Sequence, residues 1–143
     1  MKKLLILLFI FLLQKSSLAQ LKLDTSIANT FLKCDEVMNQ IKNEKYTDAM
    51  ELLKPVSRIT YEQIDTLASK MNYQLPYFIY RFGKIIGVDL IENKTIKDFL
   101  IQRTYVLRFE KYYARFEFIL YKNLVGWAVL GFKYDDNISS LFK

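Results

Sequence analysis

The sequence predicts an α+β domain in which three N-terminal helices pack on one face of a four-stranded antiparallel meander. Two observations support this prediction. The C-terminal half holds four runs rich in β-branched and aromatic residues with short connections between them, which suits hairpins and leaves no room for the long crossovers of a parallel sheet. The N-terminal half holds apolar residues at helical spacing, and a meander that buries one face needs such a cover.

Residues 1–19 have the pattern of an export signal. Two lysines precede the apolar run Leu4–Leu13, which is too short to span a bilayer as a helix. The segment Ser17-Leu-Ala19 follows the small-x-small cleavage rule. We therefore expect cleavage after Ala19, a periplasmic or secreted location, a single mature domain of residues 20–143, and no stable membrane anchor. An uncleaved anchor is the alternative.

The composition excludes several kinds of partner and chemistry. Removing residues 1–19 leaves 18 basic residues against 15 acidic ones, a formal net charge of +3 in place of the +6 of the whole chain. No cluster of lysine and arginine marks a nucleic-acid surface. The single cysteine, Cys34, cannot form an intrachain disulfide. We expect it to pack in the core as a small apolar side chain, with a reactive thiol as the alternative.

The first predicted helix is Asp24–Lys45, capped by Asp24, Thr25 or Ser26. Apolar residues recur along it at alternating steps of four and three, which places them on one stripe. The stripe consists of Ile27, Phe31, Cys34, Met38 and Ile41. This stripe is the natural cover for the sheet.

Two shorter helices are predicted next. The first is Thr47–Lys54, opened by Thr47 or Asp48 and closed by Pro55. The second is Thr60–Met71, whose opening Thr60-Tyr-Glu-Gln63 matches a capping box. Pro76 is expected to interrupt the helical pattern. We predict one more helical turn over Tyr77–Phe82, with an extended lead into the sheet as the alternative.

Four strands follow, connected by hairpin turns at 93–95, 111–112 and 123–125. The strands are Lys84–Glu92, Phe99–Glu110, Ala114–Lys122 and Gly126–Tyr134. The third strand alternates most clearly and puts Ala114, Phe116, Phe118 and Leu120 on one face. With a simple hairpin register, Ile119, Tyr121, Trp127 and Val129 share the opposite face. In the second strand Arg103 falls on the apolar face with Ile101 and Tyr105.

The order of elements, with two short segments, resembles a known superfamily. Tyr46-Thr-Asp-Ala49 with Leu52-Leu53 resembles its second helix. Tyr121-Lys-Asn-Leu-Val-Gly-Trp127, followed by Gly131-Phe132 and Asp135-Asp136, resembles its last hairpin. The superfamily is the cystatin-like, nuclear transport factor two-like group, which includes SnoaL-like and ketosteroid isomerase-like proteins. More narrowly, the chain resembles the group's small secreted bacterial domains of unknown function.

The resemblance implies a curved sheet that wraps the long first helix into a cone, with ligands held at the open end. It makes eight residues candidates for the core or the wall of a ligand pocket. These are Phe31, Met38, Ile101, Arg103, Tyr105, Phe116, Phe118 and Phe132. The fold alone does not imply a function, because it carries enzymes, binders and adaptors alike.

The sequence contains no histidine, which excludes Ser-His-Asp and Cys-His catalysis and any His-ligated metal site. No Walker A or dinucleotide-binding glycine pattern occurs, and we expect no metal and no cofactor. An isomerase-type site would need a buried carboxylate beside a tyrosine. The strand carboxylates Asp89, Glu92, Glu110 and Glu117 do not fall on the apolar face and are expected to be solvated.

Arg103 is the polar residue of most interest, because a buried guanidinium must be paired or bind an anion. A sheet end or bulge that lets it reach solvent is favoured, and carboxylate binding at the cone mouth is the alternative. Asp135-Asp136 is expected to be a solvated strand end, since adjacent strand residues point to opposite faces.

Three hypotheses for function follow. The leading one is an exported, non-catalytic domain that binds a small apolar ligand or an envelope protein partner. The second is a homodimerisation or structural module that uses the sheet face of Ile119, Tyr121, Trp127 and Val129. The third is an isomerase-like or hydrolase-like enzyme without histidine, to which no catalytic residue can be assigned.

Overall fold

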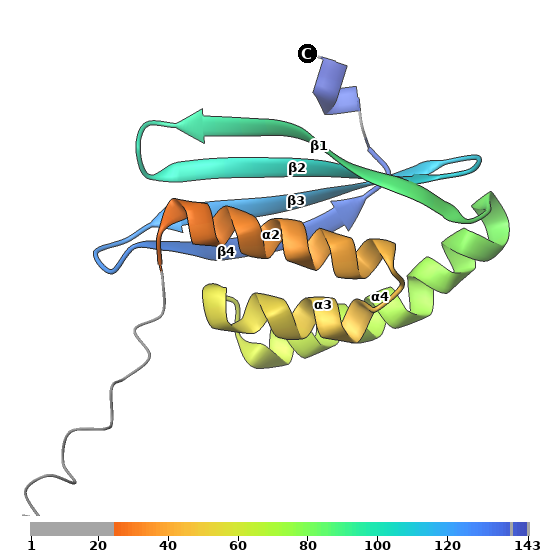
Figure 1. The fold of residues 1–143 in the computed structure, drawn as a ribbon, viewed down its shortest axis with the longest axis horizontal. Coiled ribbons are helices and arrows are strands. Elements are labelled where there is room, and N and C mark those ends of the chain that lie inside the picture. The colour runs from red at the N-terminus through yellow and green to blue at the C-terminus, as the bar shows by residue number, and fades with distance from the viewer. Residues whose placement is uncertain (1–24, 138, 143) are drawn as a thin grey trace, which may run out of the picture.

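The computed structural model describes residues 25–137 and 139–142, and within them the chain folds into three α-helices followed by four strands (Figure 1). The predicted signal peptide and its cleavage site lie outside the described residues. No helix in the described ranges is long and apolar enough to cross a membrane. The elements are α2 (Ile27–Lys42), α3 (Tyr46–Leu53), the 3-10 helix η1 (Lys54–Val56), α4 (Tyr61–Phe82), β1 (Ile85–Ile96), β2 (Leu100–Phe109), β3 (Tyr113–Lys122), β4 (Trp127–Asp135) and the 3-10 helix η2 (Ser139–Phe142).

The sheet has the order β1-β2-β3-β4 with every neighbouring pair antiparallel. The predicted α+β class, the three helices and the antiparallel meander are therefore confirmed. Figure 1 shows all three helices on one side of the sheet, with α2 nearest to it. The predicted face of the third strand is confirmed too, because Ala114, Phe116, Phe118 and Leu120 are all buried.

Helix α2 begins after Ser26, one of the three predicted caps, whose hydroxyl accepts from the amide of Asn29 at 3.1 Å. It is shorter than Asp24–Lys45 because Glu44 has φ 62°, a left-handed conformation that cannot continue a right-handed helix. Helix α3 starts at Tyr46 after Lys45, which makes no side-chain cap. The prediction that Thr47 or Asp48 opens it was therefore wrong.

Helix α4 confirms the capping box of Thr60 and Gln63, but it does not stop at Met71. It runs through Pro76 to Phe82, so the predicted interruption was wrong. Proline removes one backbone hydrogen bond, here the one to the carbonyl of residue 72. Both Pro76 and Asn72 are exposed, so water can satisfy that carbonyl, and the buried contacts of Leu75 hold the helix together.

Strand β1 is longer than predicted, and the first hairpin turn lies elsewhere. Asn93, Lys94 and Thr95 pair with β2 instead of turning. The turn is made by residues 97–99, where Lys97 adopts φ 55°, the positive backbone angle that tight hairpins require. Polar residues are tolerated in β1 because it is an edge strand and seven of the last eight positions, from Asp89 on, are exposed.

The hairpin of β3 and β4 contains a register shift between Ile119 and Leu120. A simple register was therefore the wrong prediction, because a bulge changes which residues share a face. Val129 pairs with Leu120 and is fully buried, while Trp127 packs against the core. The predicted face of Ile119, Tyr121, Trp127 and Val129 does not exist as one surface.

Candidate functional site

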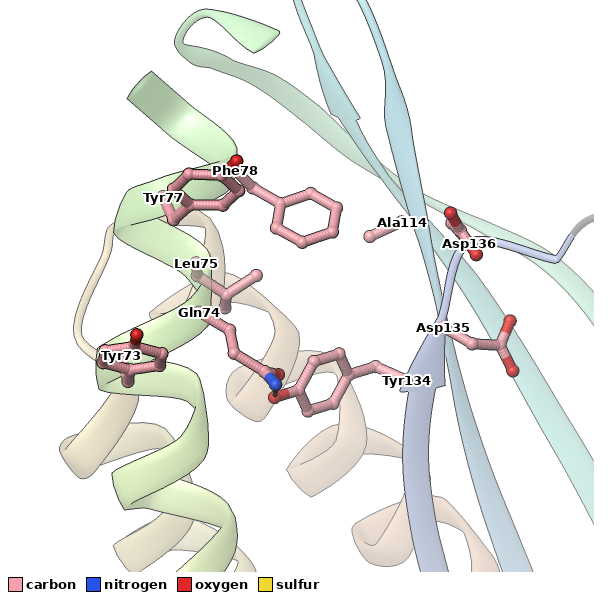
Figure 2. A pocket seen from close by; sticks show the side chains of 9 residues that line it. All are labelled: Tyr73, Gln74, Leu75, Tyr77, Phe78, Ala114, Tyr134, Asp135 and Asp136. Atoms are coloured by element: carbon pink, nitrogen blue, oxygen red, sulfur yellow. Dashed lines mark hydrogen bonds between the residues drawn. The ribbon is translucent and has the colours of Figure 1, made fainter. Parts of the chain in front are cut away.

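A cleft of about 570 Å³ opens between the C-terminal half of α4 and the adjoining ends of β3 and β4 (Figure 2). Its volume lies in the range of small-molecule sites, which are typically concave and mostly apolar. Nine residues line it: Tyr73, Gln74, Leu75, Tyr77, Phe78, Ala114, Tyr134, Asp135 and Asp136. Four of the nine are aromatic, so the cleft is a candidate ligand site.

Helix α4 supplies one wall of the cleft. Leu75 is buried and Phe78 is half-buried, and Figure 2 shows Phe78 pointing from the helix toward Ala114 on the sheet. Tyr73 and Tyr77 stand on the rim, where they are 83% and 57% exposed. This wall exists because α4 continues past Pro76, which brings Tyr77 and Phe78 into helical register with Tyr73.

Strands β3 and β4 supply the opposite wall. Ala114 at the start of β3 is buried and small, so it leaves space where a larger side chain would fill the cleft. The hydroxyl of Tyr134 donates to Oε1 of Gln74 at 2.6 Å, and its ring stacks on Phe116 at a centroid distance of 5.3 Å. Burial raises the pKa of Tyr134, which keeps the hydroxyl protonated as a donor. The bond fixes Tyr134 across the floor of the cleft (Figure 2).

Two carboxylates end the sheet wall, and they are not equivalent. Asp135 points away from α4 in Figure 2 and accepts from Nε and Nη2 of Arg115 at 3.0 and 2.8 Å. These hydrogen bonds from Arg115 lower the pKa of Asp135. Asp136 is exposed and accepts from the hydroxyl of Tyr112 at 3.3 Å. The charge of Asp135 is thus neutralised, and Asp136 is the anionic group at the rim.

Arg103 lies apart from this cleft, in a polar network between α2 and the sheet. Its Nη2 donates to Oδ1 of Asp35 at 2.7 Å and its Nη1 to Oδ1 of Asn93 at 3.0 Å, while Nε donates to the hydroxyl of Tyr105. The guanidinium also lies over the ring of Phe31, 4.4 Å from its centroid. Arg103 is buried, so the prediction that a bulge or sheet end carries it to solvent was wrong.

The pKa shifts in this network follow from burial and hydrogen bonds. Burial raises the pKa of Tyr105, and its bond to Asp35 raises it further against the opposing effect of Arg103. Burial also raises the pKa of the neighbouring Cys34 to about 12. The Cys34 thiol is fully buried and unpaired, as its predicted place in the core requires.

The other predicted pocket residues pack in the core. Met38, Phe116 and Phe118 are essentially inaccessible, and Ile101, Tyr105 and Phe132 are buried. Phe31 is partly buried against the same core. Of the eight candidates, Phe132 lines a second, more open hollow of about 670 Å³ beside the N-terminal half of α4, and Phe116 backs the first cleft by stacking on Tyr134. None of the eight lines the first cleft.

One predicted solvated carboxylate proves to be buried. Glu117 lies on the face of β3 away from the helices and is 3% exposed. Its oxygens contact Nζ of Lys133 at 2.7 Å, Nη1 of Arg115 at 3.1 Å and Nε2 of Gln102 at 2.7 Å. The long side chains of these three neighbours cover Glu117, and the alternation of residues along a single strand does not predict such cover.

The cleft residues of α4 were missed by sequence reasoning. Tyr73, Tyr77 and Tyr80 recur at helical spacing, which is the available signal of an aromatic helix face. The prediction that Pro76 interrupts the helix separated Tyr73 from Tyr77 and Tyr80, so this pattern was not recognised. Within the described residues, no cluster of three or more Cys, Asp or Glu side chains could hold a metal ion.

No family model matches the chain, and no curated protein matches it. One solved structure is similar, that of a Campylobacter jejuni protein provisionally described as an NTF2-like transpeptidase. It shares 14% identity with this chain at a TM-score of 0.48, and the match covers 74% of this chain and 99% of the other. The assignment of the fold above stands on the chain's own elements.

Proposed function

We propose that this chain is an exported, non-catalytic domain that binds a small ligand in the cleft between α4 and the sheet. The ligand would have a flat apolar body and a positively charged group. The observation that supports this most is the cleft itself: about 570 Å³, lined by four aromatic residues, with the anionic Asp136 at its rim. Aromatic faces attract both flat apolar groups and cations.

The polar groups of the cleft favour binding over catalysis. Tyr134 gives its hydroxyl hydrogen to Gln74, and Asp135 is neutralised by Arg115. Neither group is free to transfer a proton to a bound molecule. Asp136 is solvated, and an exposed ion pair contributes little affinity. Its role in the proposal is therefore to select charge and orientation, while the aromatic walls supply most of the binding energy.

Outside the cleft, the contact of Asp35 with Tyr105 gives little support to a catalytic site. Asp35 and Tyr105 contact each other, but Arg103 binds both of them. Neither residue lines the cleft or the second hollow. The isomerase-like alternative needs a carboxylate facing an open pocket, and this network supports a structural role instead.

The same proposal includes the cone-like architecture of the NTF2-like superfamily and export through residues 1–19. Export can be tested directly by expressing the whole chain in a bacterium with a periplasm. N-terminal sequencing of the processed protein is expected to begin at Gln20. Recovery of protein that still carries residues 1–19 in the membrane fraction would contradict the export part of the proposal.

The binding part can be tested with two matched probes, tryptamine and indole-3-propionate, which carry opposite charges on the same ring system. Calorimetry or ligand-observed NMR with the mature chain should show tighter binding of tryptamine. Tyr77→Ala should weaken both probes about tenfold, by loss of aromatic contact. Asp136→Asn should remove only the preference for tryptamine.

Tyr80 provides the matched control. It lies on the same helix, is 89% exposed and does not line the cleft. Tyr80→Ala should leave the affinity for both probes unchanged. Native mass spectrometry of protein from an exported preparation would complement this, because a retained small molecule would identify the natural ligand class. Equal effects of the Tyr77 and Tyr80 changes would show that the probes do not use the cleft.

A further inference from the structure

The two edges of the sheet differ in how they are covered. Along β4, Ser57 forms a parallel bridge with Val129, and the amide of Arg58 donates to the Val129 carbonyl at 2.8 Å. The segment after η1 therefore protects this edge. Strand β1 pairs with β2 on one side, and no residue in the described ranges pairs with its outer side (Figure 1).

The unpaired edge is long and partly apolar. Strand β1 has 12 residues, about twice the length of an average strand. Four large aliphatic side chains on it, Ile86, Leu90, Ile91 and Ile96, are each between 43% and 56% exposed. Soluble proteins usually protect such an edge, because its free N–H and C=O groups can pair with another strand. The edge of β1 thus has both the backbone and the apolar side chains of an association surface.

The charges on β1 indicate which strand fits it. Residues 92–96 pair with residues 100–104 of β2 without a shift, and a register shift between Leu90 and Glu92 precedes them. Glu92 and Lys94 therefore point to the same face, on either side of Asn93. Neither forms an ion pair with another described residue. If two copies pair antiparallel about Asn93, Glu92 of each lies opposite Lys94 of the other.

We infer that β1 of one chain pairs antiparallel with β1 of a second copy, centred on Asn93, to form a continuous eight-stranded sheet. Two reciprocal Glu92–Lys94 pairs set the register over residues 92–94, and the exposed side chain of Ile96 is covered at the junction. Opposite charges directly across a strand pair stabilise it, and like charges destabilise it. This dimer uses the sheet edge and does not depend on the proposed ligand. Asn93 lies at the end of β1 far from α4, so the cleft stays open.

A charge-swap experiment tests the partner and the register together. Sedimentation equilibrium of the mature chain over 1–100 μM is expected to show a dimer. Glu92→Lys makes both positions basic, and Lys94→Glu makes both acidic. Each variant alone should dimerise about tenfold more weakly. An equimolar mixture of the two variants should form heterodimers, because unlike charges then face each other.

Two controls complete the test. Lys70→Glu makes the same charge change on an exposed residue of α4 and should leave dimerisation unchanged. The double change Glu92→Lys with Lys94→Glu restores the opposite pairs and should restore the homodimer. A wild-type chain that is monomeric at 100 μM would overturn the inference. So would a dimer that neither single charge change weakens, because its interface would lie elsewhere.

Discussion

The guanidinium of Arg103 on β2 and the carboxylate of Asp35 on α2 form an ion pair at 2.7 Å that ties the first helix to the sheet. The two partners differ in exposure: the side chain of Arg103 is 6% exposed and that of Asp35 is 50% exposed. Asp35 is thus a counterion at the edge of the network, and Arg103 is the charge that burial would otherwise penalise.

The unequal exposure predicts unequal mutational effects. Asp35→Ala leaves a buried guanidinium without its counterion and should lower the free energy of unfolding by about 2–3 kcal/mol. Arg103→Met leaves a carboxylate that water can solvate, and the change should lower the free energy of unfolding by about 1 kcal/mol. Urea unfolding followed by circular dichroism measures both. Equal losses of stability would contradict the idea that the buried charge of Arg103 makes the loss of Asp35 the more costly change.

The pair of Arg115 and Asp135 predicts a pH dependence of stability. Because the pKa of Asp135 is lowered in the folded chain, its contribution is fully present above the ordinary aspartate pKa and is lost as pH falls through the folded value. Asp135→Asn should therefore be less stable than wild type at pH 6. The difference should shrink below about pH 4. A difference that stays constant from pH 6 to pH 3 would contradict this assignment.

Thr104 has a buried hydroxyl oxygen that finds no hydrogen-bond partner among the described residues. Thr104→Val keeps the shape and removes the unsatisfied group, so it should raise the free energy of unfolding by about 1 kcal/mol. The same substitution at Thr60 should instead lower the free energy of unfolding. Thr60→Val removes the cap that accepts from the amide of Gln63 and should cost about 1 kcal/mol. Chemical denaturation of the two variants gives both signs directly.

Cys34 should be unreactive in the folded chain. Burial raises the pKa of its thiol to about 12, and the thiolate is the reactive species. Alkylation by iodoacetamide at pH 7.5 should be at least 100-fold slower in the native protein than in the chain unfolded by guanidinium. Rapid native alkylation would show that the region around Cys34 opens, or that this thiol is accessible.

Patterns within a few residues correctly predicted the features of the fold that depend on local interactions. The alternation of Phe116 and Phe118 identified a core face, and Thr60 with Gln63 identified a helix start, because each depends on neighbours a few residues away. Pro76 shows where this reasoning stops. A proline inside a helix costs about 3 kcal/mol, and the sequence cannot show that the tertiary contacts of Leu75 and Phe78 compensate for it.

Register errors had a larger effect on the predicted sites. The register shift between Ile119 and Leu120 places Val129 opposite Leu120 in the core, which removes the predicted dimer face. Burial of Glu117 also depends on neighbouring strands, because Gln102 and Lys133 from those strands contact it.

The sequence by itself determined the α+β class, the order of helices and strands, the stripe of α2 and the absence of histidine chemistry. These follow from composition and from periodicity within single elements. Only the tertiary structure decided where the cleft lies, which partners hold Arg103, and which sheet edge is free. Those features join residues such as Gln74 and Tyr134, 60 positions apart, and contacts at that separation depend on packing and strand register, which local periodicity does not encode.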